Sequence, residues 1–144
     1  MEIHYPKTAF KTKTTDGIQY IWDAVRRKWV KLTPEEWVRQ NFVQYLLQEK
    51  QYPASLMAIE KGIELNGLRK RCDIVVFQDR KPWMIVECKE PNVPLSEATF
   101  MQVVRYNMVL QVPYLVITNG AHTLGWSIHN EEIQSLDCLP DWNT

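Results

Sequence analysis

Two short apolar segments, separated by only five residues, most constrain the fold of this chain. Residues 72–77 and 83–88 are rich in valine, isoleucine and other residues favoured in strands, and the connection 78–82 contains aspartate and proline. A connection of this length joins neighbouring antiparallel strands, so we expect a β-hairpin. Asp73 lies near the start of the first strand and Glu87 near the end of the second. In the hairpin, both carboxylates would lie at the same end of the sheet.

The rest of the chain alternates between strand-like and helix-like patterns. Thr33, Pro34 and Glu36 occupy the N-cap, N1 and N3 positions of a capping box, which starts a helix. Apolar residues then recur at three- and four-residue steps, and the same period returns after Pro94. We expect strands at 18–22, 28–32, 55–65, 72–77, 83–88, 114–117 and 123–128, and helices at 34–50 and 97–110. This order predicts an α/β fold: a central mixed sheet flanked by helices, with an N-terminal β-hairpin.

The length of 144 residues fits one domain. We expect an N-terminal hairpin extension at 1–32, a core at 33–128 and a peripheral acidic tail at 129–144. The 17 basic and 17 acidic residues cancel, so a contact with nucleic acid would need a local basic patch.

Several classes of protein are excluded by what the sequence lacks. It has no apolar stretch of about 18 residues for a membrane span, no apolar region of a secretory signal at its start, and no GxxxxGK[ST] phosphate loop of an ATP-driven motor. The three cysteines, Cys72, Cys88 and Cys138, show no metal-ligand spacing. We therefore expect free buried thiols and a cytoplasmic location.

The candidate metal-binding and catalytic residues lie at the end of the predicted hairpin. Because strand side chains alternate, Glu87 and Lys89 point to the same face, and Asp73 lies across from them. Two close carboxylates need a cation, and a hard ion such as Mg²⁺ takes oxygen ligands. Asp73, Glu87 and the backbone carbonyl of Cys88 would bind Mg²⁺ or Mn²⁺. Lys89 would orient or deprotonate the attacking water, or stabilise charge on the phosphate.

The motif Asp73 … Glu87-Cys88-Lys89 resembles that of the PD-(D/E)xK nuclease superfamily, although no proline precedes the aspartate. A longer ordered set of segments resembles the N-terminal nuclease domain of type I restriction enzyme R subunits, and in particular the stand-alone bacterial proteins of that kind. The resemblance covers about residues 18–128. The segments are LTPEEWVRQ at 32–40, KRCDIVV at 70–76, VECK at 86–89 and TNG at 118–120.

The resemblance implies a restriction-endonuclease-like core and metal-dependent endonuclease cleavage of DNA. It also implies an acidic residue of the first helix near the metal, for which Glu36 is the candidate and Gln40 the alternative. Gln102 and Tyr106 match a Gln-x-x-x-Tyr pair that contacts DNA or supports the site. The full restriction enzymes fuse this domain to a motor, so a separate motor or specificity subunit, or a homodimer, is an expected partner besides DNA.

Basic residues near the proposed metal offer contacts to phosphate. Arg69-Lys70-Arg71 is the stronger candidate, whereas Arg26-Arg27-Lys28 is interpreted as a solvated turn, with a backbone contact as the alternative. Simpler interpretations stay open: Asp73 and Glu87 as strand-end ion-pair partners, and Glu36 as a helix cap only. For the whole protein, the alternatives are a non-catalytic DNA-binding or assembly module of a restriction or repair system, and hydrolysis of RNA.

Overall fold

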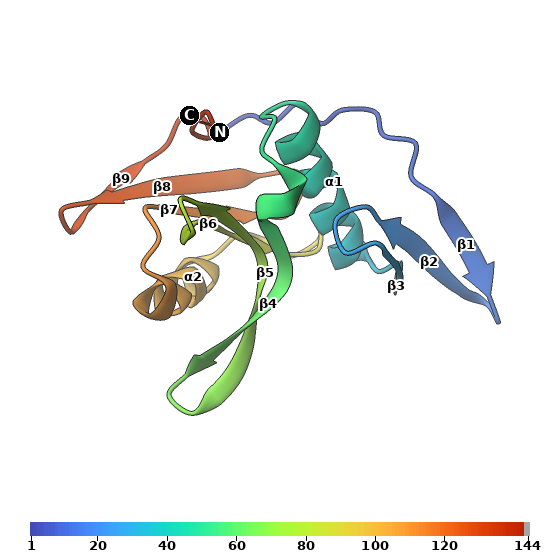
Figure 1. Cartoon of the computed structure of the whole chain (residues 1–144), viewed down its shortest axis with the longest axis horizontal. Helices are drawn as coiled ribbons and strands as arrows, with labels where there is room; N and C mark the ends of the chain where they lie inside the picture. Colours follow the sequence, from blue (N-terminus) through green and yellow to red (C-terminus); the bar gives the residue numbers. More distant parts are fainter. Residues whose placement is uncertain (143–144) are drawn as a thin grey trace.

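A six-stranded sheet forms the centre of the computed structural model, which describes residues 1–142 (Figure 1). Its first three strands are the antiparallel meander expected from the sequence, entered through a short 3-10 helix, η1. Ile74 pairs with Val86 across β5 and β6, so Asp73 and Glu87 are neighbours one residue further along. The bounds are Ala54–Leu56 for η1, Met57–Leu65 for β4, Leu68–Gln78 for β5 and Lys81–Cys88 for β6.

The second half of the sheet follows a crossover helix. The strand after helix α2 pairs in parallel with β6, and the chain then returns in two antiparallel strands, which gives the order β4-β5-β6-β7-β8-β9. The sheet is therefore mixed, as predicted. The bounds are Glu97–Leu110 for α2, Tyr114–Thr118 for β7, Thr123–His129 for β8 and Glu132–Ser135 for β9.

Helices α1 (Pro34–Gln48) and α2 pack on opposite faces of the sheet (Figure 1). Ile74 and Val76 point into the core on the α1 side, whereas Val75 and Ile85 pack with α2, because side chains alternate along a strand. The predicted N-cap is present, since the Thr33 hydroxyl accepts from the backbone amide of Glu36 at 3.1 Å. No helix within residues 1–142 is long and apolar enough to cross a membrane.

The N-terminal hairpin is confirmed and extended by one strand. β2 (Ile18–Asp23) and β3 (Lys28–Lys31) pair so that Trp22 lies opposite Trp29, with the rings edge to face and their centroids 5.5 Å apart. β1 (Thr12–Thr15) adds to the outer edge of β2. All four β1 residues are exposed and none is apolar, so no alternating pattern marked this strand in the sequence.

The C-terminal segment differs from the expected peripheral tail. Residues of β9 extend the sheet, and Leu139 beyond it is buried. The Tyr52 hydroxyl donates to the carbonyl of Pro140, and the Trp142 ring packs 5.3 Å from that of Trp83. Aromatic and aliphatic side chains therefore hold the segment against the core despite its acidic composition. The last two residues of the predicted tail, 143–144, lie outside the described residues.

Candidate active site

Asp73, in the middle of β5, and Glu87, near the end of β6, lie together, and both are nearly fully buried. One oxygen of Asp73, Oδ2, accepts from the backbone amide of Cys88 at 2.7 Å. Asp73 and Glu87 lie opposite each other, because Ile74 pairs with Val86 in the antiparallel register of β5 and β6. One oxygen of Glu87, Oε2, is buried and has no hydrogen-bond partner in the described part of the chain. The two acids therefore lie on the same side of the sheet, as the hairpin register predicted.

The closeness of these acids changes the protonation of Glu87. Burial raises the pKa of Glu87 to about 10, and the hydrogen bond and negative charge of Asp73 act in the same direction, against a smaller opposing effect of Lys89. The Glu87 carboxyl therefore keeps its proton well above the pH at which an exposed glutamate loses it. A hard divalent cation takes carboxylate oxygens as ligands and would take the place of that proton.

Lys89 follows directly after β6 and begins a chain of hydrogen bonds to two residues of helix α2. Its ammonium donates to Gln102 Oε1 at 3.1 Å, and Gln102 Nε2 donates to the Tyr106 hydroxyl at 2.8 Å. Gln102 and Tyr106 are one helical turn apart, so both reach the same side of α2. Of the two residues matched by the resemblance, Gln102 thus contacts the lysine of the motif, and Tyr106 contacts Gln102.

Arg39, on α1, is a site residue that the sequence reasoning missed. Its guanidinium is almost fully buried and lies 3.2 Å from Asp73 Oδ1, 2.9 Å from Glu60 Oε1 and 3.5 Å from Glu36 Oε1. Burial lowers the pKa of Arg39, but the carboxylates of Asp73 and Glu36 outweigh this effect and hold it above its usual range. The spacing from Glu36, three residues along a helix, was the available signal.

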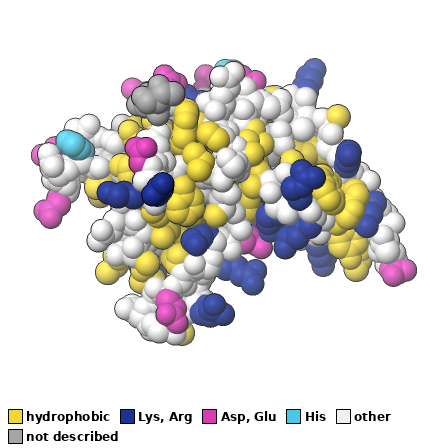
Figure 2. Space-filling view, in the orientation of Figure 1, with side chains coloured by type: hydrophobic (Ala, Val, Ile, Leu, Met, Phe, Trp, Pro, Cys, Tyr) yellow, Lys and Arg dark blue, Asp and Glu magenta, His cyan; other side chains and the backbone are white. Residues whose placement is uncertain are grey.

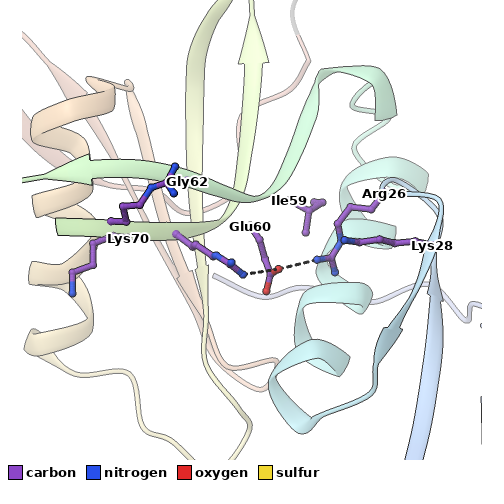
Figure 3. A pocket seen from close by; sticks show the side chains of 8 residues that line it. Arg26, Lys28, Ile59, Glu60, Gly62 and Lys70 are labelled. Carbon is purple, nitrogen blue, oxygen red and sulfur yellow. Dashed lines mark hydrogen bonds and ion pairs between the residues drawn. The ribbon is translucent and has the colours of Figure 1, made fainter. Parts of the chain in front are cut away.

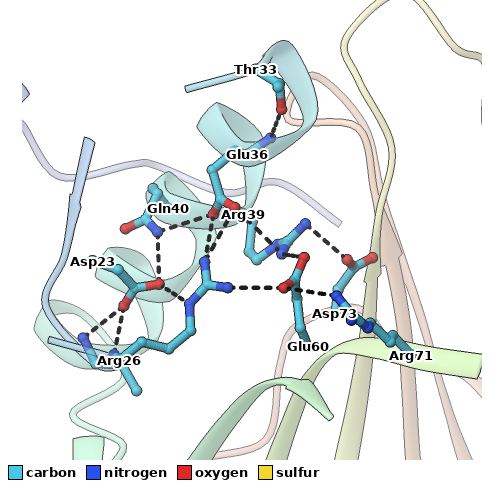
Figure 4. A network of polar contacts seen from close by, with 10 residues as sticks. Asp23, Arg26, Thr33, Glu36, Arg39, Gln40, Glu60, Arg71 and Asp73 are labelled. Atoms are coloured by element: carbon cyan, nitrogen blue, oxygen red, sulfur yellow. Dashed lines mark hydrogen bonds and ion pairs between the residues drawn. The ribbon is translucent and has the colours of Figure 1, made fainter. Parts of the chain in front are cut away.

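A second arginine, which is largely but not fully buried, joins the N-terminal sheet to α1 (Figure 4). Arg26 pairs with Asp23, with Glu36 at 3.2 Å and with Glu60 at 3.1 Å. Gln40 donates to both Asp23 and Glu36, at 3.0 Å each. The interpretation of Arg26 as part of a solvated turn is therefore wrong: three carboxylates surround it, and its side chain is only 13% exposed.

The same network distinguishes the roles of Glu36 and Gln40. Glu36 lines the cavity in front of the acidic pair, whereas Gln40 lies behind it and holds the carboxylates of Asp23 and Glu36 in place. Burial raises the pKa of Asp23, but hydrogen bonds from Arg26 outweigh it, so this pKa lies below its usual range. Glu36 is thus more than a helix cap, because its side chain serves the network while its amide is capped by Thr33.

An open cavity of about 650 Å³ contains this constellation. It is lined by six residues that the sequence singled out for the site: Glu36, Asp73, Glu87, Lys89, Gln102 and Tyr106. Arg71 lines this cavity as well, whereas Arg69 and Lys70 line an adjoining one. Within residues 1–142, no group of three or more His, Cys, Asp or Glu side chains is arranged to hold a metal ion. A metal here would therefore depend on the two carboxylates together with backbone or substrate oxygens.

Comparison with known proteins shows the family of this chain. Residues 34–140 match the family described as type I restriction enzyme R protein N terminus. The chain belongs to this family. None of the curated proteins matches it. A solved fragment assigned as an HsdR subunit of a type I restriction enzyme from Vibrio vulnificus YJ016 shares the fold, with a TM-score of 0.55 at 20% sequence identity.

The extent of these matches matters for the site. The structural match covers 76% of this chain but only 24% of the Vibrio chain, so this chain spans about a quarter of that HsdR fragment. The family match begins at Pro34 and therefore includes the acidic pair, Lys89 and α2, but not β1–β3. Arg26, which contacts Glu36 and Glu60, belongs to a part of the chain outside the family match.

Proposed function

We propose that this chain is a metal-dependent DNA endonuclease of the R-subunit N-terminal type. The observation that carries the proposal is the buried Asp73–Glu87 pair at the edge of an open cavity, with the ammonium of Lys89 on the same strand end. Burying two adjacent acids costs free energy unless a cation neutralises them, so their closeness favours a role in binding a cation. Membership of the restriction family makes DNA the expected substrate.

The residues fit a Mg²⁺ or Mn²⁺ ion. Glu87 Oε2 has no hydrogen-bond partner among the described residues, and both Asp73 and Glu87 line the cavity, with Asp73 Oδ1 3.2 Å from Arg39. Asp73, Glu87 and the backbone carbonyl of Cys88 would hold the ion. Such an ion supplies charge neutralisation for the phosphate and acidifies a bound water.

Side chains of the protein would perform the remaining steps of catalysis and the binding of DNA. Lys89 donates to Gln102, which in turn donates to Tyr106, and in this position Lys89 would orient the attacking water or neutralise charge developing on the phosphate. Glu36 positions Arg39 and Arg26 rather than contacting the phosphate itself. Arg69, Lys70 and Arg71 would bind the DNA backbone on the cavity's open side, with Gln102 a further contact.

A non-catalytic DNA-binding or assembly module is the second candidate, and one observation favours it. Arg39 already neutralises Asp73 at 3.2 Å, so the pair has a built-in counter-charge. In that case the acids would keep their structural ion pair and no phosphodiester would be cut. The two candidates differ in whether Lys89 affects turnover.

Plasmid cleavage separates these candidates. The wild type and Lys89→Ala are incubated with supercoiled DNA and Mg²⁺ or Mn²⁺, with Lys81→Ala as control because Lys81 is exposed at the opposite end of β6. We expect nicked or linear products from the wild type and the control, and a loss of at least about 100-fold for Lys89→Ala. DNA binding without cutting by any of the three proteins would contradict the nuclease and support the module. Faster cutting of RNA than of DNA would indicate that RNA is the substrate.

We further propose that the chain acts with a partner. Cutting both strands of a duplex needs two sites, which a homodimer, or a separate motor or specificity subunit bringing two chains together, would provide. The two buried free thiols, Cys72 and Cys88, suit a reducing cytoplasm. The third, Cys138, is exposed, contrary to the expectation that all three are buried.

A further inference from the structure

A second cavity of about 600 Å³ adjoins the site and is walled by two elements that are far apart in the sequence (Figure 3). Arg26 and Lys28, at the β2–β3 connection, form one side, and Lys70 on the β4–β5 hairpin lies on the other. Arg26, Lys28, Glu60 and Arg71 line both cavities, so the two are continuous. The result is a groove that runs from the β4–β5 hairpin to the acidic pair.

The charges along this groove do not cancel. Lys28, Lys31, Arg69 and Lys70 are exposed and form no ion pair with any described residue. Glu60, a partly exposed acid that lines the groove, already forms ion pairs with arginines. Figure 2 shows Lys and Arg side chains gathered along the edge between β1–β3 and the β4–β5 hairpin. A chain of zero net charge therefore concentrates free positive charge at this groove.

We propose that the N-terminal sheet, β1–β3, is a DNA-binding element that forms the second wall of this groove. Lys28 and Lys31 would contact phosphates on one side while Arg69 and Lys70 contact them on the other, which directs the backbone toward Asp73. This inference rests on the proposed function and extends it to a part of the chain that the family match does not include.

The two walls are held in fixed positions, as a binding groove requires. Arg26 joins the N-terminal sheet to β4 through Glu60 at 3.1 Å and to α1 through Glu36 at 3.2 Å. Because this arginine is partly shielded from solvent, its ion pairs are screened less by salt than fully exposed pairs are. The basic side chains beyond it can therefore meet a phosphate backbone without first ordering the sheet.

Gly62, on β4, keeps the groove open. It lines the cavity opposite Arg71 in the strand pairing, and a Cβ placed on it meets nothing within 4 Å. Its backbone φ is not in the left-handed region, so other residues fit this position without strain. A side chain introduced here would enter the space that we assign to DNA.

The first experiment measures binding apart from cleavage. Fluorescence anisotropy of a labelled DNA duplex is recorded in EDTA for the wild type and for Lys28→Ala/Lys31→Ala. The matched control is Lys7→Ala/Lys81→Ala, which removes the same charge at exposed positions outside the groove. For the first double variant we expect weaker binding and a fall of about two in the slope of log K against log salt. Binding and slope equal to those of the control would overturn the inference.

Substitutions at Gly62 test the position of the DNA with opposite charges. Gly62→Lys is expected to tighten binding severalfold and Gly62→Glu to weaken it severalfold, with thermal unfolding showing that both fold. Equal affinities of the two variants would overturn the groove. Tighter binding of RNA than of DNA of the same sequence would overturn the DNA assignment.

These outcomes separate the inference from the proposed function. If the chain is no nuclease, Lys89→Ala and the wild type both fail to cut, yet the loss of binding in Lys28→Ala/Lys31→Ala still supports the groove. If the groove is wrong, the wild type cuts DNA and this double variant binds DNA as the control does.

Discussion

The protonation of a single residue, Glu87, links the stability of this protein to its proposed chemistry. Burial and the neighbouring Asp73 raise the pKa of Glu87 to about 10, far above the range of an exposed glutamate. In the unfolded chain this group loses its proton near pH 4, whereas the folded chain keeps it. Between these pH values the folded state binds more protons, so its stability falls as pH rises.

Glu87→Gln tests this effect directly. The amide is neutral at every pH and can still donate to Asp73, so we expect the variant to be more stable than the wild type at pH 8, with a difference that shrinks toward pH 4. Each unit of pKa shift corresponds to about 1.4 kcal/mol, so a gain of at least that size is expected. Thermal unfolding in EDTA across this pH range is the measurement.

The exposed Glu64→Gln serves as the control and should leave the pH profile unchanged. Mg²⁺ should stabilise the wild type more at pH 8 than at pH 5, because the ion replaces the proton, and should have little effect on Glu87→Gln. If the stability of the wild type and of Glu87→Gln changed with pH in the same way, the raised pKa of Glu87 would be contradicted.

At the scale of elements, helix α1 depends on Arg39 for its attachment to the sheet. The guanidinium connects α1 to β4 through Glu60 and to β5 through Asp73. Arginine suits this position because its delocalised charge pairs with several carboxylates at once. The helix is therefore held at its polar end by charge and at its apolar end by the core residues Phe42 and Leu46.

Arg39→Met removes this attachment while keeping much of the side-chain volume. The variant leaves buried carboxylates without their cation, so we expect a loss of about 3–5 kcal/mol in the free energy of unfolding. Chemical denaturation at pH 7 measures it, with Arg105→Met, an exposed position on α2, expected to lie within about 0.5 kcal/mol of the wild type. A lower pH should reduce the loss, since protonation removes the unpaired charges; a loss that is independent of pH would argue against this explanation.

At the scale of the whole molecule, the C-terminal segment closes the core. Leu139 is 2% exposed, and the carbonyl of this residue accepts from the Lys50 ammonium at 3.1 Å. The aromatic rings of Tyr52, Trp83 and Trp142 pack around this region. The segment therefore contributes to the stability of the entire domain even though its sequence is acidic.

Leu139→Ala is expected to cost about 2–5 kcal/mol in the free energy of unfolding, because a buried leucine leaves a cavity when it is truncated. Urea unfolding followed by tryptophan fluorescence would measure this loss. Leu68→Ala provides the comparison, since Leu68 is 60% exposed at the start of β5 and its truncation should be nearly neutral. Similar effects of the two substitutions would show that the segment is not part of the core.

Most elements and the centre of the site could be predicted because they depend on short stretches of sequence. The capping residues marked the start of α1 at Pro34, and the helix ends two residues before the predicted end. The hairpin was predicted correctly, although its connection is two residues, Asp79 and Arg80, and not the five expected. The hairpin brought Asp73 and Glu87 together without any knowledge of distant parts of the chain. The spacing of Gln102 and Tyr106 likewise placed both on one side of α2.

What the sequence by itself determined was local: the periodicity of each strand and helix, and hence the pairing of Asp73 with Glu87. Only the tertiary structure decided that Arg39 and Arg26 surround this pair, that β1–β3 lies beside it and that Leu139 enters the core. These contacts join residues that are far apart along the chain, and a buried arginine has the same sequence signature as an exposed one. The partners of such an arginine depend on how α1, β4 and the N-terminal sheet pack against one another. The hydrophobic periodicity of a single segment does not contain this information.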